Sequence, residues 1–166
     1  MSETLRSLRR IRGLVAAQAE GGLLDRLFVM QTAVMEALAA QDARLCADYV
    51  YGAASDRYYA FAARNRTLIA EMGLANLAAI VDGQTSKIAR STPNEDDFRA
   101  LEEGLTQRGL SREEIEALVD GKAPDPPLSD ERMCAAGRAY MAALTALAPD
   151  IRLRIEALVV QLMART

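Results

Sequence analysis

The chain contains no histidine, and this narrows the chemistry that its side chains can do. Histidine is the commonest general base and the usual zinc ligand. Catalytic arrangements of the Ser/His/Asp or Cys/His type are therefore excluded by composition. The sequence also lacks a phosphate-binding glycine loop and a Gly-x-Ser-x-Gly motif. We expect a protein that is not an enzyme and that holds no cofactor and no metal.

Carboxylates remain as candidates for metal chemistry. Glu102 and Glu103 lie one helix before Glu113 and Glu116, and two facing helices could hold Mg²⁺ between such pairs. These acids lie opposite the apolar positions of their predicted helices, however, which indicates a solvated acidic face. A carboxylate-only, Mg²⁺-dependent hydrolase therefore ranks only as the second alternative function.

Cys46 and Cys134 each lie early in a predicted helix. In a reducing compartment each would be a small, buried, apolar residue. In an oxidising compartment they could form a disulfide between the central helices and the C-terminal hairpin. Closing so long a loop restricts the unfolded chain by roughly 4 kcal/mol in the entropic model. The sequence leaves both states open.

A group of tyrosines and arginines is the best candidate for a binding site. Tyrosine and arginine are the side chains that most often anchor protein interfaces. The alternative interpretation is that the rings close one end of the bundle, with their hydroxyls reaching water or a carboxylate. The candidate interface consists of Tyr49, Tyr51, Arg57, Tyr58, Tyr59, Arg64 and Arg66.

The elements that must position these groups are helices. Apolar residues recur at helical spacing, as in the stripe of Leu24, Phe28, Met35 and Leu38, and little of the sequence alternates with period two. The chain has 166 residues, of which 51% are hydrophobic and 26% charged. These features predict an all-α, single-domain, irregular helical bundle of about seven to eight helices.

Several boundaries can be read from caps and breaks. Asp42 suits the N-cap of a short helix from Ala43 to Tyr51, and the helix that follows is expected to end at Gly73. A further helix carries an apolar stripe and is bent or interrupted at Gly83. The stripe consists of Leu74, Leu77, Ile80, Val81 and Ile88.

The second half of the chain has the clearest local signals. Capping boxes are predicted at Thr92, with Pro93 as the first helical residue, and at Ser111. Prolines mark residues 123–128 as an extended connector, and Ser129 suits the N-cap of the helix that follows. Arg152 and Glu156 are expected as an ion pair on the outer face of the last helix.

Residues 1–22 read as a basic, amphipathic arm, separate from the bundle at 23–166, and Gly21-Gly22 is expected to let the arm swing. The arm suggests weak membrane-surface contact through Arg6, Arg9, Arg10 and Arg12. Nucleic acid is not an expected partner, because the formal net charge is −3. Moreover, Glu113, Glu114 and Glu116 would meet the phosphates of DNA docked on a helix-turn-helix there.

The leading hypothesis is a non-enzymatic protein–protein interaction domain: an adaptor, regulator or assembly subunit with another protein as partner. The first alternative is an extracytoplasmic sensor or ligand-binding domain stabilised by a Cys46–Cys134 disulfide. The compartment is cytoplasmic by default, because no signal peptide is evident. It becomes periplasmic or otherwise extracytoplasmic if the native N-terminus lies upstream of Met1.

Overall fold

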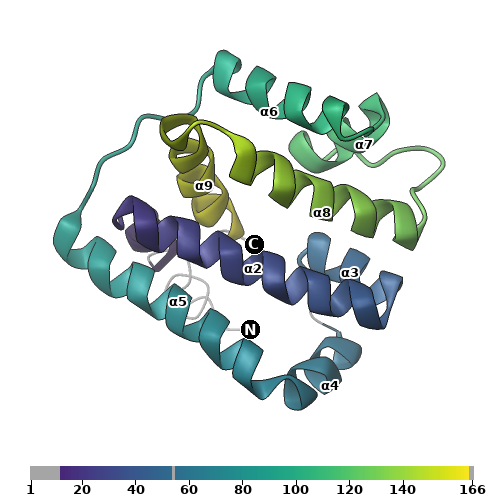
Figure 1. Ribbon diagram of the computed structural model, residues 1–166, viewed down its shortest axis with the longest axis horizontal. Coiled ribbons are helices and arrows are strands. Elements are labelled where there is room, and N and C mark those ends of the chain that lie inside the picture. Colours follow the sequence, from purple (N-terminus) through teal and green to yellow (C-terminus); the bar gives the residue numbers. More distant parts are fainter. Residues whose placement is uncertain (1–11, 54, 165–166) are drawn as a thin grey trace. The chain divides into compact units, whose positions relative to one another are not determined.

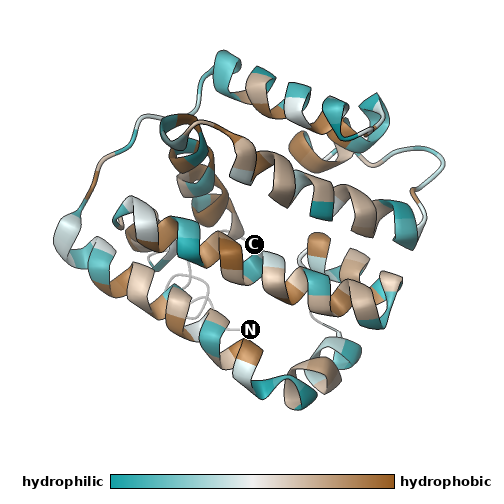
Figure 2. Ribbon diagram, in the orientation of Figure 1, coloured by the Kyte–Doolittle hydropathy of each residue, from teal (hydrophilic) through white to brown (hydrophobic). Residues whose placement is uncertain are grey.

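The computed structural model describes residues 12–53 and 55–164, and throughout these ranges the chain forms helices and no strand (Figure 1). The all-α prediction is confirmed. Hydrophobic residues recur along each of the long helices (Figure 2). The helices are α2 (Gly21–Gln41), α3 (Ala43–Val50), α4 (Asp56–Arg64), α5 (Arg66–Ser86), α6 (Glu95–Gln107), α7 (Arg112–Val119), α8 (Asp130–Ala146) and α9 (Pro149–Met163).

The contacts divide the chain into two compact units. Unit 1 consists of the chain up to Gln31, Thr67–Asn94, and the chain from Ala148 onward. Unit 2 consists of Thr32–Arg66 and Glu95–Leu147. Helix α2 contributes its first half to unit 1 and its second half to unit 2.

Unit 2 is built around α8, which packs against α3, α6 and α7. Gly137 of α8 meets the side chain of Val50 so closely that a Cβ atom would overlap it, which lets the two helix axes approach. The core is apolar and collects side chains from five helices. Its largest fully buried members are Leu38, Leu45, Phe61, Leu101, Leu105, Met133 and Leu144.

Unit 1 packs small residues of α5 against its neighbours. Ala75, Ala79 and Gly83 are the buried residues of this helix, and a Cβ atom on Gly83 would overlap the backbone carbonyl of Val15. The larger buried side chains come from α2 and α9, and include Leu24, Leu27, Phe28, Ile155 and Val160. The close backbone approach at Gly83 and the half-buried Leu68, Met72 and Ile80 both contribute to the packing of α5.

Local signals located some helix starts correctly and others wrongly. The side chains of Asp42, Ser111 and Ser129 cap α3, α7 and α8 as predicted, and Ser111 and Glu114 form a full capping box. The predicted box at Thr92 is wrong, because α6 begins at Glu95. Pro93 lies before that helix in an extended segment.

The central helix boundary also differs from the prediction. Helix α4 ends at Arg64, with Asn65 as its C-cap, and α5 then runs unbroken through Gly73 and Gly83. The predicted stop at Gly73 is wrong because glycine only weakens a helix, by about 1 kcal/mol, and the packed face of α5 compensates for that.

The arm was expected to swing, but its described part is packed. Ala16, Ala17 and Ala19 are buried in unit 1, and the Ile88 amide donates to the carbonyl of Gln18. Gly21 begins α2 instead of breaking the chain. Arg12 is exposed, and the membrane-surface prediction for Arg6, Arg9 and Arg10 lies outside the described residues. Over the described ranges, no helix is both long and apolar enough to cross a bilayer.

Candidate functional site

The tyrosine-bearing region lies in unit 2, on α3, α4 and the turn between them. Asp42 starts α3 by accepting a hydrogen bond from the Leu45 amide, and Ser55 starts α4 by accepting one from the Tyr58 amide. Gly52 adopts φ +71° in the turn, a left-handed conformation that favours glycine. Arg57 of α4 forms an ion pair with the carboxylate of Asp42, which fixes the start of α4 against the start of α3.

Four rings form one cluster around Tyr58. Its centroid lies 6.1 Å from Tyr49, in a stacked arrangement, and 6.3 Å from Tyr59 and from Phe61. Phe61 is buried. Burial, followed by the nearby Tyr58, raises the pKa of Tyr49, and burial, followed by Tyr59, raises the pKa of Tyr58. The inner rings are therefore neutral packing elements at physiological pH.

The outer members of the candidate interface face solvent. Tyr59 is 62% exposed, and Ala60 and Ala63, its neighbours on α4, are exposed as well. These short side chains leave the ring of Tyr59 open to a partner. Arg64 is exposed, and the Nε of Arg66 donates to the carbonyl of Ala63.

The structure therefore brings together only part of the predicted set. Tyr49, Tyr58 and Tyr59 belong to the ring cluster, and Arg57 is held beside it by Asp42. Within the described residues the ring contacts do not include Tyr51, which is 63% exposed at the end of α3. Whether any of these residues binds a partner stays a prediction.

Cys46 and Cys134 are joined in the core of unit 2. Their Cα atoms are 5.3 Å apart and the two cysteines form a disulfide across 88 positions of sequence. The bridge links α3 to α8, the two helices whose close contact Gly137 permits. Of the two states that the sequence left open, the geometry fits the disulfide.

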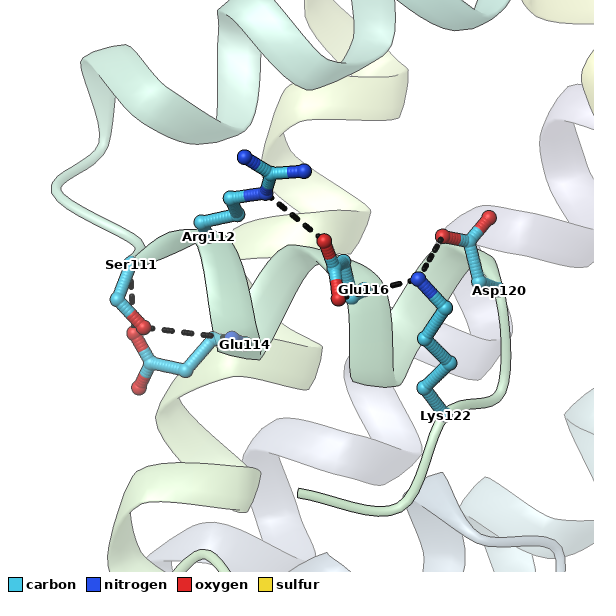
Figure 3. A network of polar contacts seen from close by, with 6 residues as sticks. All are labelled: Ser111, Arg112, Glu114, Glu116, Asp120 and Lys122. Carbon is cyan, nitrogen blue, oxygen red and sulfur yellow. Dashed lines mark hydrogen bonds and ion pairs between the residues drawn. The ribbon is translucent and has the colours of Figure 1, made fainter. Parts of the chain in front are cut away.

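Of the four carboxylates considered for a magnesium site, Glu116 is bound to two cations. Glu116 accepts from the Nε of Arg112 at 2.8 Å and from the Nζ of Lys122 at 3.2 Å (Figure 3). The neighbouring Glu114 is buried, because it completes the capping box that begins at Ser111 and pairs with Arg132 at 2.7 Å. The described parts of the chain hold no group of three or more acidic or cysteine side chains that could bind a metal ion.

Sequence reasoning missed a buried charged cluster in unit 1. Glu156 is only 2% exposed, so its predicted place on the outer face of α9 is wrong. Its Oε1 lies 3.9 Å from the Nε of Arg152, and its Oε2 has no hydrogen-bond partner among the described residues. Arg152 points instead to Asp25 of α2, which it holds with two bonds of 2.8 and 3.0 Å.

The surroundings of Glu156 favour its protonated form. Burial, and then the charge of Asp25, raise the pKa of Glu156 from 4.5 to about 8, although Arg152 and Arg90 oppose the shift. Arg90 lies on the segment before α6 and donates to the carbonyls of Ala17 and Ala19, at 2.9 and 2.6 Å. A helical plot could not reveal this cluster, because an i, i+4 Arg–Glu pair is more often found on a solvated face.

No protein-family model, curated protein or solved structure gives a significant match to this chain.

Proposed function

We propose that this protein is a non-enzymatic interaction domain that binds another protein through the exposed side of α3 and α4. The observation that supports it most is the placement of Tyr59. The chain has few aromatic residues, five Tyr and three Phe, yet the ring of Tyr59 stands 62% exposed on α4 beside alanines, and Arg64 is exposed at the end of the same helix. Exposed tyrosine and arginine on a rigid support are the usual anchors of protein interfaces.

The support beneath Tyr59 is preorganised. Tyr58 stacks on Tyr49, Phe61 is buried, and the Arg57–Asp42 ion pair ties the start of α4 to the start of α3. A partner would therefore meet a surface that is already ordered, which lowers the entropy cost of binding.

The test replaces only the exposed residues Tyr51, Tyr59 and Arg64 by alanine. Tyr58 is left intact because its loss would disturb the packed rings. The wild-type chain is used as bait under native conditions, bound proteins are quantified by mass spectrometry, and melting temperature confirms that the variant is folded. A partner that binds the wild type should be depleted at least tenfold on the triple variant.

A matched control replaces exposed residues elsewhere in unit 2, with Arg99→Ala on α6 and Arg112→Ala on α7. The control should retain the partner. If the triple variant retains the partner equally well, the surface of α3 and α4 is not the interface.

The disulfide supports a second candidate, an extracytoplasmic sensor or ligand-binding domain. A disulfide in a core is typical of oxidising compartments. Protein expressed in a bacterial periplasm should contain no free thiol after denaturation, whereas cytosolic material should contain two. Two free thiols in the periplasmic protein would contradict this candidate, and would leave the interaction surface on α3 and α4 unaffected.

A further inference from the structure

Helix α5 presents large aliphatic side chains to solvent, although the sequence pattern predicted that they pack on the bundle. Leu74, Leu77 and Val81 are each more than half exposed, while the buried residues of the helix are Ala75, Ala79 and Gly83. The fully buried residues of the helix are therefore small, and three of its large aliphatic residues face solvent. An exposed apolar stripe of this kind marks an interaction site more often than isolated exposed leucines do.

The exposed stripe has the spacing of a coiled-coil seam. Its members follow one another at intervals of three, four, three, four and three residues, and each of them is exposed. This alternation keeps a row of side chains on one side of a helix that packs against another helix. The stripe consists of Thr67, Ala70, Leu74, Leu77, Val81 and Gln84.

The stripe is complementary to itself when two copies run in opposite directions. An antiparallel pair centred between Ala75 and Asn76 sets residues whose numbers add to 151 opposite each other. Leu74 then meets Leu77, and the small Ala70 meets the larger Val81. At both ends the polar Thr67 meets the polar Gln84, so that no polar side chain is forced into the apolar centre.

The charges and small residues beside the stripe agree with this pairing. Gly73 faces Ala78 of the second copy, and both are small enough for the helices to approach closely. Glu71 is the only charged residue between Thr67 and Val81. The two copies of Glu71 would be separated by roughly nine residues of rise, about 13 Å, which exceeds the Debye length of about 8 Å at physiological salt.

We propose that α5 is a self-association helix that pairs antiparallel with α5 of a second copy of this chain. The interface is isologous, as in most homodimers, because the same stripe serves both subunits. It lies in unit 1, whereas the surface on α3 and α4 lies in unit 2.

The first experiment measures the mass of the oxidised full chain by sedimentation equilibrium between 1 and about 100 μM, a range that covers weak and moderate homodimers. The expected result is a concentration-dependent species of twice the 18.0 kDa chain mass. A chain that stays monomeric over this range overturns the proposal. The exposed stripe would then bind a partner other than a second copy of the chain.

The second experiment places a charge in the centre of the stripe. Leu77→Glu should weaken dimerisation at least 100-fold, with circular dichroism and melting temperature showing that the subunit remains folded. Val29→Glu is the matched control, because Val29 is 60% exposed on α2 of the same unit and lies outside the stripe. Equal dimerisation of both variants overturns the assignment of α5.

The third experiment tests the direction of the pair by cross-linking with a short bis-maleimide. A mixture of Ala70→Cys and Val81→Cys chains should cross-link to each other. Ala70→Cys alone should not, because its two copies would lie roughly 16 Å apart along the axis. Efficient cross-linking of Ala70→Cys with itself would indicate a parallel pair and overturn the proposed register.

Discussion

Unit 1 and unit 2 hold their helices together by different means. Unit 2 has a disulfide between α3 and α8, and short helices capped by Asp42, Ser111 and Ser129. Unit 1 includes neither cysteine. It relies on the close approach of Gly83 to Val15 and on the buried carboxyl of Glu156 beside Asp25 and Arg152. The stability of unit 2 should therefore depend on redox conditions. The stability of unit 1 should depend on pH and on the size of the residue at position 83.

The largest expected effect comes from removing the disulfide. Replacing Cys46 and Cys134 by alanine frees a loop of 88 positions, and should lower the free energy of unfolding by roughly 4 to 5 kcal/mol in the entropic model. Amide hydrogen exchange would locate the loss, which should be greatest for α3 and α8. An equal loss of hydrogen-exchange protection in α9 would mean that the disulfide stabilises both units alike.

The second largest effect should come from the close contact between Gly83 and the Val15 carbonyl in unit 1. Gly83→Ala places a Cβ atom against the carbonyl of Val15, a backbone group that cannot rotate away. We expect a loss of about 3 kcal/mol by chemical denaturation. Gly22→Ala on α2 is the control in the same unit, because no atom lies near its Cβ position, and it should not lower the free energy of unfolding. Similar results for both variants would show that the close approach is unimportant.

The third effect is a dependence of stability on pH. Because the pKa of Glu156 is about 8 in the folded chain and near 4.5 when unfolded, the folded state binds one more proton between these values. Raising the pH from 5 to 8 should therefore lower the free energy of unfolding, by roughly 1 kcal/mol per pH unit.

Glu156→Gln should remove most of this slope, because the amide stays neutral throughout. The control is Asp150→Asn, which changes an exposed carboxylate of the same helix and should leave the slope intact. Denaturant-induced unfolding at pH 5, 6, 7 and 8 would measure the slope of the free energy of unfolding against pH. A wild-type protein whose stability is flat over this range would show that Glu156 is ionised when folded.

The smallest effect tests the caps of unit 2. Ser111→Ala removes the side chain that accepts from the Glu114 amide at 3.3 Å, and should cost about 1 kcal/mol. Ser91→Ala, an exposed position in the extended segment of unit 1, should have no measurable effect in the same thermal melts. A Ser111→Ala protein as stable as the wild type would show that the Ser111 hydroxyl does not contribute measurably to the cap of α7.

The sequence predicted the helices better than it predicted their surroundings. The stripe of α2 was correctly placed, since Leu24, Phe28, Met35 and Leu38 are buried. The errors on Leu77 and Glu156 share one cause. Helical periodicity shows which residues share a face. It does not show which face meets a neighbour when both faces are apolar, as on α5. It also fails when a charged pair lies between helices, as on α9.

For the candidate site, too, the sequence indicated which residues belong together but not how each is exposed. Tyr49, Tyr58 and Tyr59, which the sequence grouped in one candidate interface, also share ring contacts, but whether this surface binds a partner stays a prediction. Which ring would be buried and which exposed could not be predicted, because successive residues of a helix point about 100° apart and the neighbour of α4 was unknown.

By itself, the sequence determined the all-helical class and the caps at Asp42, Ser111 and Ser129, because these depend on interactions within one turn of chain. Only the tertiary structure decided that Cys46 meets Cys134, that Glu156 is buried near Asp25, and that Leu74, Leu77 and Val81 face solvent. Each of these depends on contacts between residues tens of positions apart, or on the lack of such contacts, and short-range spacing carries no information about them.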